Sequence, residues 1–203
     1  MKSFIVAISG ASGSIYGIRL VKELIKAEIN VHLCLSNQSF SIIKTETGID
    51  LSGITVQEIE EKVRKYFNSE TVNYYGNGNL AAPISSGSFT TDGMFVVPCS
   101  MKTLAGIANG YASNLIVRAA DVVMKEGRKL ILSPREMPFS TIHLENMLKL
   151  SRMGVTIAPP IPAFYQKPEN MDNIIEFVVG KLMDSAGIEN SLFKRWDGVM
   201  NQD

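Results

Sequence analysis

Hydrophobic residues along the chain fall into short continuous runs that alternate with longer amphipathic segments. Runs with little internal alternation, such as 2–9 and 94–97, are typical of parallel strands covered on both faces. Strands are predicted at residues 2–9, 31–35, 72–75, 94–97, 130–132 and 155–157. Helices are predicted at about 16–25, 40–47, 56–66, 141–150 and 174–183, with two more between 104 and 129.

This order of elements predicts an α/β fold. We expect a single-domain, three-layer αβα arrangement around a mostly parallel sheet, of the flavodoxin-like or Rossmann-like kind. The 203 residues suffice for one domain with a sizeable core, and no break in composition marks a second. The domain is therefore expected to span 1–203, with a C-terminal tail from about residue 188. Only the polar stretch 76–91 reads as a long loop.

The amino-acid composition argues against several classes of function. The formal net charge is zero, which argues against nucleic acid as a partner, and no apolar run is long enough to span a membrane. The two cysteines, Cys34 and Cys99, lie in or beside apolar runs and read as buried thiols of a cytoplasmic protein. The two histidines, His32 and His143, read as core residues, which argues against a zinc site.

Polar loops follow two of the predicted strands within the stretch 92–136. Pro98 ends one apolar run and precedes Ser100, Met101, Lys102 and Thr103, whereas Pro134 ends another and precedes Arg135 and Glu136. Ligands of open parallel sheets bind beyond the carboxyl ends of the strands. We therefore expect the functional site at these loops, with hydroxyl, ammonium and guanidinium groups that suit an anion.

A glycine-containing turn, residues 10–14 (Gly-Ala-Ser-Gly-Ser), joins the first strand to a helix. Free N–H groups at a helix start can bind phosphate, although the turn could equally be a tight connection without a ligand. Ser36 ends the second strand on the same edge of the sheet. Together these turns predict a cradle for a phosphorylated, flat ligand.

Other charged and aromatic residues could have either a structural or a functional role. Arg118 and Lys125 share one helix face; Arg118 has apolar neighbours and should be partly buried, whereas Lys125 reads better as a solvated charge. Glu46 reads better as a helix-surface charge. Tyr165 and Trp196 could be core or interface aromatics, or an apolar wall that keeps water from a reactive intermediate.

Several motifs in a fixed order resemble the UbiX-type flavin prenyltransferases. The resemblance runs from Gly10 to about Trp196. It rests on residues 85–89 (Ser-Ser-Gly-Ser-Phe), 98–107, 118–122 (Arg-Ala-Ala-Asp-Val), 134–138 (Pro-Arg-Glu-Met-Pro) and 142–148.

This resemblance implies an enzyme that needs no metal and forms a homo-oligomer, typically a dodecamer. It implies reduced FMN as the acceptor and dimethylallyl phosphate as the donor of a prenyl group that becomes attached to flavin N5 and C6. The prenylated FMN would then serve a UbiD-type decarboxylase. Two alternatives stay open, namely a non-catalytic FMN-binding subunit of a decarboxylase and a related flavin-dependent cysteine decarboxylase.

The resemblance also implies roles for individual residues. Those implied to hold FMN are Gly10, Ala11, Ser12, Ser36, Ser100, Met101, Lys102, Thr103 and Arg135. Those implied to surround the prenyl phosphate are Arg118, Lys125, Glu136, Tyr165 and Lys181, with Ser12 and Glu46 near the reacting flavin edge. Lys181 stands where some members have arginine, so it would keep the charge but lose the bidentate fork.

Overall fold

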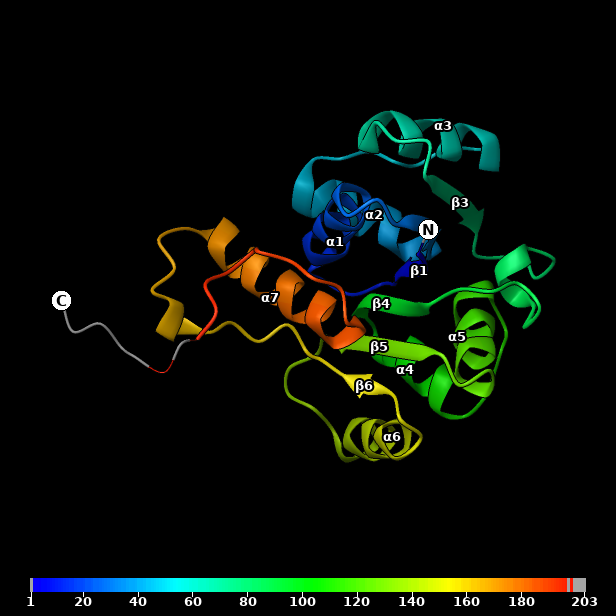
Figure 1. The fold of residues 1–203 in the computed structure, drawn as a ribbon. Helices are drawn as coiled ribbons and strands as arrows, with labels where there is room; N and C mark the ends of the chain where they lie inside the picture. The colour runs from blue at the N-terminus through cyan, green and yellow to red at the C-terminus, as the bar shows by residue number, and fades with distance from the viewer. Residues whose placement is uncertain (1, 197, 199–203) are drawn as a thin grey trace.

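A computed structural model describes residues 2–196 and 198, and these form one α/β unit around a single sheet (Figure 1). In the described residues the strands are β1 (Ser3–Ile8), β2 (Asn30–Leu35), β3 (Val72–Gly76), β4 (Gly93–Cys99), β5 (Lys129–Pro134) and β6 (Thr156–Ile157). All neighbouring pairs are parallel, and the order is β3-β2-β1-β4-β5-β6. This is the strand order of Rossmann folds, which confirms the predicted fold class.

Helices cover both faces of the sheet and complete the three layers (Figure 1). One face carries α1 (Ser14–Lys26), α2 (Asn37–Thr47), α3 (Val56–Phe67) and α7 (Met171–Ala186). The other carries α4 (Met101–Ala108), α5 (Leu115–Lys125) and α6 (Thr141–Arg152). Two short 3₁₀ turns, η1 (Pro83–Ser85) and η2 (Phe164–Gln166), interrupt the longer connections.

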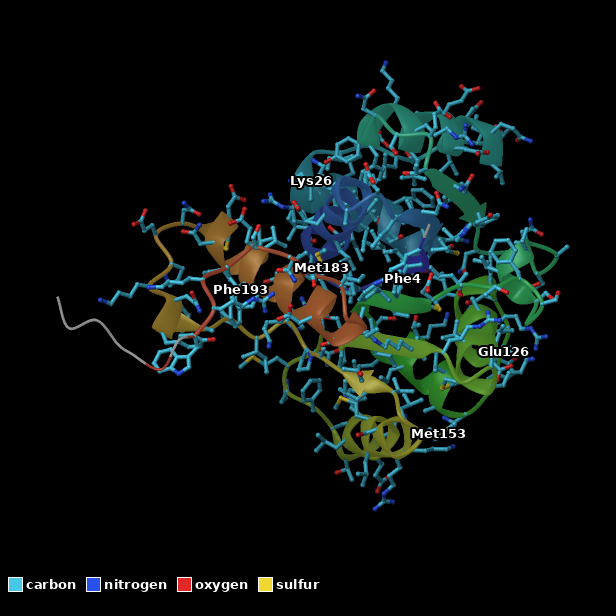
Figure 2. All side chains as sticks on the ribbon, viewed as in Figure 1. Phe4, Lys26, Glu126, Met153, Met183 and Phe193 are labelled. Atoms are coloured by element: carbon cyan, nitrogen blue, oxygen red, sulfur yellow. The ribbon has the colours of Figure 1, made fainter. Side chains whose placement is uncertain are left out.

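The central strands are buried on both faces, which explains their continuous apolar sequences. In β1, Phe4, Val6 and Ile8 pack into the core below α1 and α7, whereas Ile5 and Ala7 pack into the core on the opposite face. Figure 2 shows Phe4 and Met183 in the interior and Lys26, Glu126 and Met153 nearer the periphery. The strand is therefore apolar without alternation because neither face meets water.

Helix α1 lies unusually close to the sheet at Gly17. A Cβ atom at this position would come within 2.3 Å of the carbonyl oxygen of Val97, so only glycine allows the contact. The close approach fixes the start of α1 over the ends of β1 and β4. It is there that the polar turns of the predicted site converge.

The structure corrects two local predictions. Pro98 does not end its strand, because β4 continues to Cys99, whereas β5 does end at Pro134. The pairing register shifts between Val96 and Cys99, and this irregularity accommodates a residue without an N–H group. His143 is not a core residue: its Nδ1 accepts a hydrogen bond from the Ser140 N–H in a capping box at the start of α6.

Residues 188–196, which follow α7, fold back along that helix. Arg195 binds the carboxylate of Asp184 through two nitrogen atoms, and the Nδ2 of Asn190 donates to the Gly180 carbonyl oxygen at 3.2 Å. Residues 188–196 contain no helix or strand. In the part of the chain that the structure covers, no helix has the length and apolar character that a membrane crossing would need.

Candidate functional site

The site lies where the sheet changes direction. From β1 the chain moves outward to β2 on one side, whereas β4 neighbours β1 on the other side and leads outward to β5. The loops after β1 and β4 therefore diverge and leave a crevice between them, which is the usual ligand position in such folds. The loops after β2 and β5 border the same edge.

A buried serine joins the two central loops. Ser9 Oγ donates to the carbonyl oxygen of Pro98 at 2.9 Å and accepts from the N–H of Ser100 at 2.7 Å. The Ser9 N–H also donates to the Pro98 carbonyl oxygen, at 3.2 Å. These bonds hold the start of α4 against the end of β1, so they set the shape of the crevice.

A first cavity of about 390 Å³ opens at this crevice. Cavities of this size, about 300–1,000 Å³, hold small molecules and cofactors. Residues that the sequence predicted for the site make up most of its lining: Gly10, Ala11, Ser12, Glu46, Ser100, Met101, Arg135 and Glu136. The remaining lining residues, Ser41, Ile42 and Thr45, come from α2. The structure thus brings together residues from the loops after β1, β4 and β5 with one face of α2.

A second cavity of about 700 Å³ adjoins the first. The two share Gly10, Ser100, Met101 and Glu136. The second adds Ser36, Lys102 and Thr103 from the predicted set, and it also reaches the start of α5. All nine residues implied to hold FMN therefore line one cavity or the other.

The carboxylate of Glu46 occupies the start of α1. It accepts hydrogen bonds from the Gly13 N–H at 3.1 Å, from the Ser14 N–H at 2.9 Å and from the Ser14 hydroxyl at 2.7 Å. Burial raises the pKa of Glu46, but hydrogen bonds from Ser12, Ser14 and Gly13 outweigh it, so the pKa lies below the ordinary value of 4.5. Glu46 is exposed on α2, as the sequence suggested, but its carboxylate also binds the start of α1.

This contact also changes the interpretation of the glycine turn. The N–H groups expected to bind a phosphate at the start of α1 already bind a carboxylate of the same chain. The anion site at this helix start is thus filled by Glu46, while Gly10, Ala11 and Ser12 still line the first cavity.

Two other helix starts border the second cavity and remain open. Ser100 Oγ caps α4 by accepting from the Thr103 N–H, and Ser36 Oγ caps α2 by accepting from the Ser39 N–H. The N–H groups of Met101 and Lys102 have no acceptor among the described residues. Two helix dipoles and unpaired N–H groups make this cavity the stronger phosphate site.

Arg118 and Lys125 lie outside both cavities, on α5. Arg118 is partly buried, as expected: its Nε donates to the Ser85 carbonyl oxygen at 3.2 Å, and its guanidinium lies 3.4 Å from the Asp121 carboxylate. Lys125 is exposed, and its ammonium pairs with Glu126 at 2.5 Å. Arg118 therefore contacts η1, and Lys125 lies near Gly87 in the loop that follows it; neither residue lines a crevice cavity.

Tyr165 and Lys181 form a third group beside α7. The Tyr165 ring meets Phe177 and Trp196 edge to face, with centroid distances of 6.0 and 5.9 Å. Lys181 lines a groove of about 240 Å³ that Phe177 also lines, and its Nζ is 3.8 Å from the Asp184 carboxylate. Within one chain, these residues do not line the crevice cavities.

The sequence-based prediction missed three residues at or near the site, and only one of them has a local signal. Asn114 could have been found as a helix N-cap, since its Oδ1 accepts from the Val117 N–H. The side chains of Ser9 and Asn77 bond only to segments distant in sequence, for example at separations of 91 and 39 residues. Within the described residues, no group of three or more histidine, cysteine or carboxylate side chains is placed to hold a metal ion.

The fold and site define a class. The chain is a Rossmann-type α/β protein with an anion-binding crevice at the point where the sheet changes direction. The family described as Flavoprotein matches residues 1–183. The flavin prenyltransferase UbiX of Methanocaldococcus jannaschii is 52% identical over 195 residues, covering 96% of this chain and 98% of that protein. The chain therefore belongs to the UbiX flavin prenyltransferases within the Flavoprotein family.

Solved structures agree with this assignment. The crystal structure of AnUbiX (PadA1) in complex with FMN and dimethylallyl pyrophosphate matches with a TM-score of 0.88 at 39% identity, over 98% of this chain and 99% of that one. A dodecameric FMN-dependent UbiX-like decarboxylase from Escherichia coli O157:H7 matches with a TM-score of 0.86 at 47% identity, over 97% and 100% of the two chains.

Proposed function

We propose that this protein transfers the dimethylallyl group of dimethylallyl phosphate to N5 and C6 of reduced FMN and releases phosphate. The observation that carries the proposal is the pair of adjoining cavities, one bordered by open helix starts and the other by the carboxyl groups of Glu46 and Glu136. A phosphate-bearing planar ligand fits such a pair. The full-length similarity to UbiX flavin prenyltransferases supports this choice of ligand.

The chain's own groups suit FMN. The capped starts of α2 and α4, with Ser36, Ser100, Lys102 and Thr103, would hold the phosphate end in the second cavity. The turn Gly10–Ser12, with Met101 and Arg135, would hold the ring system in the first cavity. When bound there, reduced FMN supplies the nucleophilic atoms N5 and C6.

The remaining predicted residues suit the departure of phosphate. When the carbon–oxygen bond of dimethylallyl phosphate breaks, its electron pair leaves with the phosphate. Cations at Arg118, Lys125 and Lys181 would stabilise that charge. Glu136 would hold or move the proton of the phosphate, and Ser12, hydrogen-bonded to Glu46, would handle the proton at the flavin edge. The Tyr165 ring would stabilise positive charge on the prenyl carbons and exclude water.

A homo-oligomer is part of the proposal. The crevice residues, the pair Arg118 and Lys125, and the pair Tyr165 and Lys181 form three separate groups in one chain. Contact between copies can bring the three groups to one substrate. Helix α6 exposes Ile142, Leu144 and Leu148, whose exposed fractions of 67%, 53% and 51% suit burial against another copy. A dodecamer, the state of the E. coli relative, is the assembly we expect.

The proposed function also indicates a recipient for the product and a cellular compartment. The prenylated FMN would pass to a UbiD-type decarboxylase as its cofactor. The cytoplasm suits the two free and buried thiols, Cys34 and Cys99, because it is reducing. We propose that residues 1–203 act as one functional unit, in which residues 188–196 of the tail pack on α7.

The test is an anaerobic incubation of the purified protein with reduced FMN and dimethylallyl phosphate, followed by mass spectrometry of the extracted flavin. A flavin heavier by one five-carbon prenyl unit is expected. A reaction without protein and one with a characterised flavin prenyltransferase serve as the two controls. Bound but unmodified FMN, beside an active control enzyme, would contradict the proposal and favour a non-catalytic FMN-binding subunit.

A further inference from the structure

Asn77 connects the sheet to the start of α5. It follows β3 directly, and its carbonyl oxygen accepts a hydrogen bond from the Leu115 N–H at 2.8 Å. Its side-chain Oδ1 accepts from the next N–H, that of Ile116, at 3.1 Å. Asn77 thus satisfies two of the N–H groups that a helix start leaves without partners.

The hydrogen bond to Ile116 fixes which way the carboxamide group faces. Because Oδ1 accepts from a backbone N–H, the Nδ2 group is the opposite end of the same planar amide. Cys34 Sγ lies 3.8 Å from Oδ1 and also contacts it as a donor. Nδ2 has no acceptor among the described residues, and Asn77 lines the second cavity. An unused donor of fixed orientation therefore belongs to the wall of that cavity.

The open helix starts of α2 and α4 line the same cavity. Ser36, Ser100 and Lys102 line the same cavity as Asn77, and the positive ends of α2 and α4 favour an anion there. The α5 start adds no free N–H at Leu115 or Ile116, because Asn77 binds both. At the start of α5, the free Nδ2 group of Asn77 therefore takes the place of those two N–H groups as a donor toward an anion.

We propose that Asn77 is a further FMN-binding residue whose Nδ2 donates a hydrogen bond to the phosphate of the flavin nucleotide. This inference rests on the proposed function, since it takes FMN as the occupant of the second cavity. It gives Asn77 two roles at once: its oxygen caps α5, and its nitrogen binds the ligand.

The two roles can be separated by Asn77→Asp. Aspartate keeps the oxygen that accepts from Ile116 N–H, and a negative charge at a helix start is favourable, so α5 should stay capped. The substitution removes the N–H donor and places a negative charge beside the phosphate. The control is Asn170→Asp at the exposed start of α7, where Oδ1 likewise accepts from a backbone N–H, that of Asn173, at 3.0 Å.

The experiment titrates FMN and riboflavin, which lacks the phosphate, into the wild type and both variants, and records the Tm of each protein. Asn77→Asp should raise the Kd for FMN by a factor of about 10 or more, because a hydrogen bond to a charged group is lost. Its Kd for riboflavin and its Tm should match the wild type. Asn170→Asp should bind both flavins as the wild type does.

Wild-type FMN affinity in Asn77→Asp would overturn the inference, as would an equal loss of FMN and riboflavin binding. If Asn77→Asp does not fold, Asn77→Ala is measured instead: a lower preference for FMN over riboflavin supports the inference, and an unchanged preference overturns it. A wild-type protein that binds neither flavin would overturn the proposed function and this inference with it.

Discussion

The hydroxyl of Ser9 lies 2.7 Å from the backbone nitrogen of Ser100 and accepts its hydrogen bond. Ser9 directly follows β1, whereas Ser100 caps α4. One buried hydroxyl therefore ties together the two loops whose divergence creates the ligand crevice. The position of the α4 start, which we propose binds the FMN phosphate, depends on this bond as well as on its own cap.

Removing that hydroxyl should weaken both the fold and the site. Ser9→Ala leaves the Ser100 N–H and the Pro98 carbonyl oxygen without this partner in a buried place. We expect a loss of about 1–3 kcal/mol in the free energy of unfolding and a higher Kd for FMN. Urea denaturation and a fluorescence titration with FMN measure the two effects.

Ser133→Ala is the matched control, because Ser133 is also a buried serine but its Oγ has no partner among the described residues. It should cost little or even stabilise the protein. If the two substitutions lowered the free energy of unfolding equally, the loss in Ser9→Ala would not come from the Ser9 hydrogen bonds.

Glu46 should make stability depend on pH. Its pKa in the folded protein is lower than the ordinary value of 4.5, because hydrogen bonds at the start of α1 favour the carboxylate despite burial. A lowered folded pKa adds stability above the ordinary value, and that stability is lost as the pH falls through the lowered pKa. Glu46→Gln should therefore be less stable than the wild type at pH 7, and the difference should shrink below about pH 4.5.

Urea denaturation of both proteins at pH 7 and at pH 3.5 checks this expectation. Glu61→Gln provides the comparison, because Glu61 lies on α3 and makes no ion pair or hydrogen bond with the described residues. A difference between wild type and Glu46→Gln that stays constant over this pH range would show that the carboxylate charge at α1 does not stabilise the fold.

Ser36 and Glu46 illustrate which parts of the site could be predicted from the sequence and which could not. Polar turns after apolar runs depend on neighbouring residues, so the sequence predicts them. The structure confirms that the turns with Ser36 and Ser100 lie at the same edge of the sheet. Glu46 reaches Ser14 across 32 residues only because α2 packs beside α1. No local pattern contains that contact.

The predicted strands show the same division. Continuous apolar runs reveal the buried strands, yet their exact ends depend on the sheet: β4 passes through Pro98 because its pairing register shifts there. The motifs of the resemblance indicate a shared substrate for residues such as Arg118 and Lys181. They carry no information on whether one chain brings those residues together.

Glu136 should act on the reaction more than on FMN binding. It is exposed at the rim shared by both cavities, where its carboxylate accepts only a local bond from the Met137 N–H at 3.1 Å. Glu136→Gln should leave the Kd for FMN close to wild type and slow prenyl transfer by about 100-fold or more, as for loss of a general acid–base group. Single-turnover kinetics with dimethylallyl phosphate measure the rate; wild-type turnover would exclude Glu136 from proton transfer.

Two inactive variants should restore activity to each other if the site forms between copies. Glu136→Gln removes a crevice group, whereas Arg118→Ala removes a group of α5 that lies outside the crevice in one chain. In a mixed oligomer, some sites would pair the intact crevice of one copy with the intact Arg118 of another. We expect prenyl transfer in subunits unfolded together and refolded to exceed that of either variant alone. A mixture no more active than its components, although mass spectrometry finds hybrid oligomers, would place Arg118 and Glu136 of one site in the same chain.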